Sequence, residues 1–95
     1  MNIHDLHDPQ KSVSAKPVFK GDTGSITAIQ LLSNKQLKEH ITKTPALLVC
    51  ITGKVIFNNA NGLSETLMPG DYIIISPMVK HSLDAEVDSH LLLYK

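Results

Sequence analysis

The side chains best suited to chemistry in this sequence are imidazoles and one thiol. They are His4, His7, His40, His81, His90 and Cys50. Imidazole changes charge near neutral pH, donates or accepts hydrogen bonds, and is a common ligand of transition metals. The function therefore depends on which histidines the fold brings together in a protected position.

His81 begins a segment with the alternation of a half-buried strand. His81, Leu83, Ala85 and Val87 fall on one side of it. Because a strand buries its apolar side, His81 is predicted to point into the interior beside Leu83. The other side of the segment consists of Ser82, Asp84, Glu86 and Asp88. Its acidic residues predict a solvated strand face rather than a catalytic cluster.

The neighbours of the other histidines define their positions less well. His40 shares the more polar side of its segment with Thr42, so a surface position and a pocket position both stay open. The neighbours of His90 do not fix its face. His4 and His7 would ligate a metal only if the N-terminal segment became helical and folded over the mouth of the interior; otherwise they are surface residues.

Cys50 is predicted to be a small core residue rather than a reactive thiol. It lies in an apolar run with no histidine or lysine beside it in the sequence. It falls on the same side as Ala46 but about 13 Å further along the strand, too far to join His81 as a ligand. A single cysteine cannot form an internal disulfide, which agrees with a reducing compartment.

Short β-rich runs separated by turn residues predict an all-β domain. The 95 residues suffice for one core. We expect residues 1–15 to form an N-terminal arm and residues 16–95 to form the domain. The expected strands are Pro17–Phe19, Ser25–Leu32, Leu37–Ile41, Ala46–Thr52, Val55–Asn58, Ser64–Met68, Tyr72–Ile75, Ser82–Val87 and Leu91–Tyr94.

Charge and hydropathy exclude several classes of partner. Nine lysines balance nine acidic residues and there is no arginine, so nucleic acid is not an expected partner. The longest apolar run, Ala46–Ile51, is far shorter than the roughly 20 residues that cross a bilayer. Met1–Asp8 has neither the charged region nor the apolar region of an export signal, so we expect the cytoplasm.

Two predicted strands, Ala46–Ile51 and Tyr72–Ile75, are apolar on both faces. Such strands need cover on the outside of the domain as well as on the inside. A second subunit is the favoured cover, which predicts a homodimer. Packing of the N-terminal arm on the outer face is the alternative.

Two groups of residues carry a family resemblance. His40 and Gly53 form the first; Gly70 and His81, eleven residues apart, form the second. Their spacing, with the wording Met68-Pro69-Gly70-Asp71 and Ile75-Ser76-Pro77, resembles the two motifs of the cupin superfamily and its small, RmlC-like single-domain bacterial members. The matching positions lie between His40 and His81, a span of somewhat under half of the chain.

The sequence also departs from both cupin motifs. In the first motif, Thr42 takes the place of the second histidine, Ala46 that of the glutamate and Asn34 that of the opening glycine. In the second, Met78 takes the place of the second glycine. Ser76 and Ala85 replace its proline and asparagine.

The resemblance implies an antiparallel β-barrel, the double-stranded β-helix or cupin jelly roll, with an interior pocket. It also implies a divalent metal such as zinc, nickel, iron or manganese, for which only His40 and His81 remain as ligands, whereas catalytic sites generally use about three. The expected pocket residues are His40, Thr42, Leu48, His81 and Leu83.

Three functions stay open at this point. The favoured one is binding of a small organic ligand, with His40 and His81 as polar anchors. The second is a metal-dependent enzyme, of dioxygenase or isomerase type, with a depleted metal site. The third is an interaction protein that presents only its outer surface.

Overall fold

The computed structural model describes residues 1–95 and contains nine strands and one short 3-10 helix, η1. All nine predicted runs are strands. Their bounds, after η1 (Ile3–Leu6), are β1 (Val13–Lys20), β2 (Ser25–Leu31), β3 (Gln36–His40), β4 (Ala46–Thr52), β5 (Val55–Asn59), β6 (Ser64–Leu67), β7 (Tyr72–Ile75), β8 (His81–Ala85) and β9 (Ser89–Tyr94).

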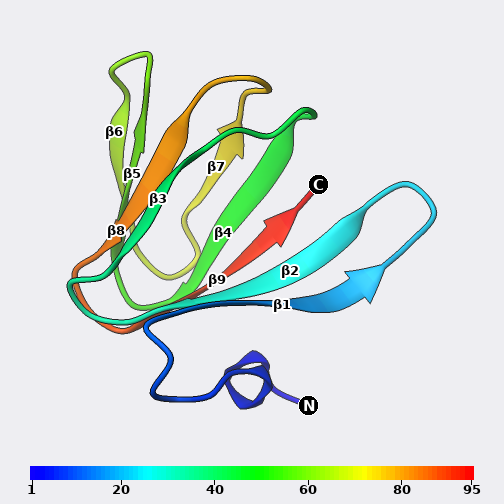
Figure 1. Ribbon diagram of the computed structural model, residues 1–95, viewed down its shortest axis with the longest axis vertical. Coiled ribbons are helices and arrows are strands. Elements are labelled where there is room, and N and C mark those ends of the chain that lie inside the picture. Colours follow the sequence, from blue (N-terminus) through cyan, green and yellow to red (C-terminus); the bar gives the residue numbers. More distant parts are fainter.

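The strands form two antiparallel sheets that face each other (Figure 1). One sheet has the order β1-β2-β9-β4-β7 and the other the order β3-β8-β5-β6. From β2 onward the chain repeatedly crosses between the sheets, so strands distant in sequence become neighbours. This connectivity is that of a jelly roll, and the predicted all-β fold class is confirmed.

The core fills the space between the sheets. On β4, alternation turns Ala46, Leu48 and Cys50 inward, and all are nearly fully buried. Phe57 is the largest fully buried side chain. Burial of each large apolar side chain contributes roughly 1.5–3 kcal/mol relative to exposure, so packing supplies the stability that a disulfide cannot.

The expected alternation of β8 holds for three of its four inward residues. His81, Leu83 and Ala85 are buried, whereas Val87 is 47% exposed. The prediction for Val87 was wrong because β8 ends at Ala85 and the chain turns before β9.

β1 begins at Val13, inside the segment predicted to be an arm. Val13 pairs with Leu31 and Ser14 with Gln30 of β2. The strand therefore starts before the predicted limit at residue 16, and the arm that precedes it is correspondingly shorter.

Two positions that the cupin motifs assign to glycine adopt the left-handed backbone conformation although they carry side chains. Asn34 has φ 63° and Met78 has φ 64°. Gly53, the closing glycine of the first motif, has φ 93°, and a Cβ atom there would collide with Ser89 and with the carbonyl of Asp88. Asn34 and Met78 thus adopt a positive φ, which glycine adopts at no steric cost.

The N-terminal arm lies against the outer face of the five-stranded sheet, beside β2 (Figure 1). Gln30 of β2 and His90 of β9 point outward, yet they are only 3% and 7% exposed. On β7 the outward Tyr72 and Ile74 are 64% and 60% exposed. The arm thus covers one part of the outer face and leaves β7 open.

No helix is long and apolar enough to cross a membrane.

Candidate ligand-binding site

Strand pairing brings His40 and His81 together. His40 is the last residue of β3 and lies opposite His81, the first residue of β8. Their ring centroids are 4.1 Å apart at an interplanar angle of 62°. His81 is 2% exposed, while His40 is half-buried at the mouth of the interior. Phe57 of β5 also stacks on His81, with centroids 5.6 Å apart.

Backbone carbonyls fix the tautomers of both rings. His40 Nδ1 lies 3.1 Å from the carbonyl oxygen of Lys38, and His81 Nδ1 lies 3.3 Å from that of Val79. A carbonyl oxygen only accepts hydrogen bonds, so both Nδ1 atoms must carry the proton. In the neutral form, a ring held in this way has its lone pair on Nε2.

The interior favours the neutral form of His81. Burial lowers the pKa of His81 below its ordinary value of 6.5, and the nearby His40 and Lys95 act in the same direction. The hydrogen bond to Val79 opposes this shift without cancelling it. At neutral pH, His81 is thus an uncharged acceptor in apolar surroundings.

Thr42 brings a hydroxyl group into the same part of the fold. It is 2% exposed, and its Oγ1 atom has no hydrogen-bond partner. Its carbonyl oxygen accepts a 2.8 Å hydrogen bond from the backbone of Met78, which ties the loop after β3 to the loop before β8. An unpaired buried hydroxyl costs stability, and such groups call for a functional explanation.

The remaining predicted pocket residues are packed in the hydrophobic core. Leu48 on β4 is 1% exposed and Leu83 on β8 is 2% exposed. Phe57 pairs with Leu83 in register. Sequence reasoning placed Phe57 on a strand without assigning it to the site, and only its register with β8 identifies it as a neighbour of His81.

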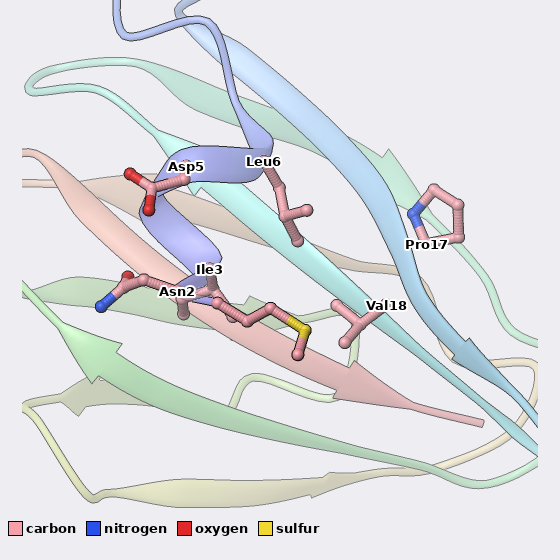
Figure 2. A pocket seen from close by; sticks show the side chains of 7 residues that line it. Asn2, Ile3, Asp5, Leu6, Pro17 and Val18 are labelled. Carbon is pink, nitrogen blue, oxygen red and sulfur yellow. The ribbon is translucent and has the colours of Figure 1, made fainter.

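The main surface hollows lie elsewhere. One of about 390 Å³ separates η1 from β1; there Figure 2 shows Leu6 reaching toward Val18. None of the five principal hollows is lined by His40 or His81.

The residues present only partly fit a metal. His40 and His81 offer two Nε2 donors, but no group of three or more histidine, cysteine or acidic side chains is arranged to hold an ion. Ala46, at the glutamate position, offers no donor. Burial raises the pKa of the Cys50 thiol, and its sulfur lies 3.5 Å from the Thr52 carbonyl, away from the pair.

The other histidines are outside the interior. His90 lies on the outer face of β9, where its ring centroid is 3.8 Å from that of His4. The arm forms the single turn η1 against the sheet, so His4 and His7 do not reach the mouth as a metal site there would require. Asp84, Glu86 and Asp88 are partly or fully exposed, in agreement with a solvated surface. Ser82, predicted on the same side, is 8% exposed and therefore buried.

No protein-family model and no curated protein matches the sequence, but solved structures resemble the fold. A cupin superfamily protein from Desulfitobacterium hafniense has a TM-score of 0.86 at 12% identity, covering 98% of this chain and 84% of the other. A cupin-2 domain containing protein from Shewanella frigidimarina has a TM-score of 0.82 at 14% identity, covering 100% of this chain and 92% of the other. KdgF from a Halomonas species has a TM-score of 0.80 at 18% identity, covering 96% of this chain and 85% of the other.

The two sheets form a jelly roll in which the pair of His40 and His81 lies at one end of the apolar core. Its architecture is that of the cupin superfamily, as the spacing of the two motifs predicts. At these identities the similarity defines the fold, and one fold carries many activities.

Proposed function

We propose that this protein binds a small organic molecule at the mouth of the interior, with His40 and His81 as its polar anchors. The observation that carries the proposal is the pair itself. Both rings are oriented by backbone carbonyls through Nδ1, which leaves Nε2 of each ring outside those bonds. Fixed polar groups beside apolar walls are typical of ligand sites.

The chemistry of the pair selects the ligand class. Neutral Nε2 atoms accept hydrogen bonds, so the ligand must donate them through hydroxyl or amine groups. Phe57, Leu48 and Leu83 favour an apolar body behind those donors. Thr42 Oγ1, which has no partner in the protein, supplies a further hydrogen bond to the ligand.

Entry of the ligand requires the His40 ring to move away from His81. The pairing of β3 with β8 is irregular between Leu37 and His40, so the end of β3 is held by fewer ladder bonds than a regular strand. His40 is also the more exposed of the two rings. Movement of His40 opens the space that its contact with His81 closes.

A thermal-shift screen tests this proposal. A library of small hydroxylated and amine-bearing aromatic and aliphatic compounds should contain hits that raise the melting temperature. Those shifts should disappear in His81→Leu and persist in His4→Gln, which changes an exposed histidine outside the interior. Hits that stabilise His81→Leu as strongly as the unsubstituted protein would overturn the proposal.

A metal-dependent enzyme of dioxygenase or isomerase type is the second candidate, and the orientation of the rings favours it. Histidines that bind metals commonly donate the other ring nitrogen to a backbone carbonyl, as His40 and His81 do. Water or substrate would have to complete the ligand set. Stoichiometric metal in the purified protein, lost in both His40→Ala and His81→Ala, would establish this candidate; less than one-tenth equivalent after supplementation would reject it.

We further propose that the protein is a homodimer that buries the outer face of β7. Tyr72 and Ile74 project from this strand, which is at one end of the five-stranded sheet. The N-terminal arm covers β2 and β9 instead, so it does not replace a second subunit at β7. Adjacent exposed apolar side chains are typical of interfaces.

A further inference from the structure

A second histidine cluster lies on the outside of the molecule, where the N-terminal arm meets the sheet. The ring of His90 on β9 is 3.8 Å from the ring of His4 and 5.8 Å from that of His7, measured between centroids. His7 is 5% exposed and His90 is 7% exposed. The arm therefore buries two imidazoles against each other on a face that would otherwise be solvated.

Gln30 attaches the arm to the sheet. Its Nε2 donates to the carbonyl oxygens of Asp8 and Lys11 at 2.8 and 3.0 Å. Its Oε1 lies 2.9 Å from His90 Nε2 and must accept, so His90 carries a proton on Nε2. His90 Nδ1 faces Thr52 Oγ1 at 3.3 Å. Because both nitrogens of His90 have protein partners, and no metal-binding group is present, the cluster is not a metal site.

His7 is the most sensitive member of the cluster. Its Nδ1 lies 2.7 Å from Ser14 Oγ, while its buried Nε2 has no partner. A protonated imidazole carries N–H groups at both positions. Protonation of docked His7 would therefore leave a charged donor buried and unpaired, which is costly.

We propose that the N-terminal arm is a proton-sensitive latch, which is docked while His7 and His90 are neutral and released when they take up protons. Protonation places like charges on neighbouring rings, and His4 adds a third imidazole beside them. Release lets these rings reach water. The proposal is independent of ligand binding at His40 and His81.

The charged groups around the cluster set the direction of the pH dependence. Burial lowers the pKa of His7, with smaller contributions from Lys16 on β1 and from His4. Burial also lowers the pKa of His90, assisted by His4 and His7 and opposed by Asp88. Asp5 and Asp88 line the same hollow, of about 480 Å³, and Asp8 bonds the backbone of Gln10 instead.

The lowered pKa values of His7 and His90 in the docked arm determine whether acid favours docking or release. A released arm has histidines with the ordinary pKa of 6.5, so protons favour release. Docking is complete above this pH and weakens as the pH falls below it. The ratio of docked to released arm should fall by up to about tenfold per pH unit for each histidine that titrates.

Apolar contacts hold only part of the arm, since Ile3 is half-buried at a hollow that Ile51 and Leu92 also line. Leu6 is 41% exposed, and Figure 2 shows it beside Val18 at the hollow between η1 and β1. A 3-10 turn of four residues is not stable on its own. Docking thus depends on the contacts of Gln30, His7 and His90.

NMR of the full chain between about pH 7.5 and pH 5 tests the latch. We expect the nuclear Overhauser effect between the His4 and His90 rings to vanish as the pH falls below 6.5. Backbone amides of residues 2–11 should gain fast motion while those of β9 stay rigid. An arm that is already free at the higher pH, that stays ordered at the lower pH, or that loses order only together with the sheet would overturn the proposal.

Variants assign the effect to its residues. His7→Gln with His90→Gln should keep the arm docked throughout, while the control His40→Gln should retain the transition. A double variant that releases its arm at the same pH as the unsubstituted protein contradicts the proposal. If the double variant does not dock at all, His4→Gln provides the test. Removing the charge of His4 beside His7 and His90 should move the midpoint of arm release to lower pH. An unchanged midpoint rejects the latch.

Discussion

Thr42 exemplifies the difference between stability and function at the scale of one residue. Its hydroxyl is buried, has no partner in the protein, and occupies the position where the cupin motif has a histidine. A core optimised for stability alone would use an apolar side chain here. The hydroxyl is explained if a ligand completes its hydrogen bonding.

Thr42→Val tests this explanation. The substitution keeps the shape and removes the unpaired hydroxyl, so the free energy of unfolding in urea should rise by about 1 kcal/mol. The hits of the ligand screen should bind less well to this variant. Thr52→Val is the matched control, because Thr52 Oγ1 is paired with His90 and its loss should lower stability. Destabilisation by Thr42→Val would contradict the account.

His81 should make stability depend on pH. Its pKa is lowered in the folded protein, chiefly by burial, so its contribution is complete above the unfolded value of 6.5 and is lost as the pH falls through the folded value. The free energy of unfolding should therefore decline below this pH, and less steeply in His81→Leu. Equal slopes in His81→Leu and in the unsubstituted protein would show that His81 is not responsible.

At the scale of the elements, the turns carry strain that the strands do not. Met78 and Asn34 both have left-handed backbones, but the short amide of Asn tolerates this conformation and a long side chain does not. Met78 also lies in the loop that borders the mouth, hydrogen-bonded to Thr42. Local strain of this kind is common at binding sites.

Replacing each residue by glycine measures that strain. Met78→Gly should raise the free energy of unfolding by roughly 0.5–1 kcal/mol, because relief of the strain exceeds the added chain entropy of glycine. Asn34→Gly should change it by less than about 0.5 kcal/mol. Denaturant unfolding of the two variants side by side provides the measurement. A larger gain for Asn34→Gly than for Met78→Gly would refute this ranking.

The strands could be predicted from sequence because turn residues and a period of two mark them locally. Ala46–Thr52 and Tyr72–Ile75 have the predicted bounds. The start of β1 was missed because the apolar residues of Val13 to Ala15 are not the buried ones: Ser14 is buried and Ala15 is exposed, and this part of the strand exists through pairing with β2. Val87 was misassigned because alternation does not show where a strand ends.

At the scale of the whole molecule, the parts of the site differ in how far the sequence predicts them. Alternation alone places His81 inside, whereas the position of His40 depends on the register between β3 and β8, a pairing of segments distant in the chain. The face of His90 and the place of His4 and His7 depend on how the arm docks. Only tertiary contacts determine that docking.

The homodimer is tested by size-exclusion chromatography with light scattering. The unsubstituted protein should have twice the mass of one chain, and Ile74→Asp should reduce it to one chain because a charge would be buried at the interface. Val18→Asp is the matched control, since Val18 is exposed on β1 beside the arm. A monomeric unsubstituted protein, or an Ile74→Asp variant that remains dimeric, would reject an interface at β7.

The central claim is that His40 and His81 present two unprotonated Nε2 atoms to a ligand. A long-range proton–nitrogen NMR spectrum of the histidine side chains at about pH 7.5 tests it directly. Both residues should be Nδ1–H tautomers, and the stabilising compounds of the screen should shift both Nε2 resonances together. An Nε2–H tautomer at either residue, or compounds that stabilise the protein while both resonances stay in place, would contradict the account.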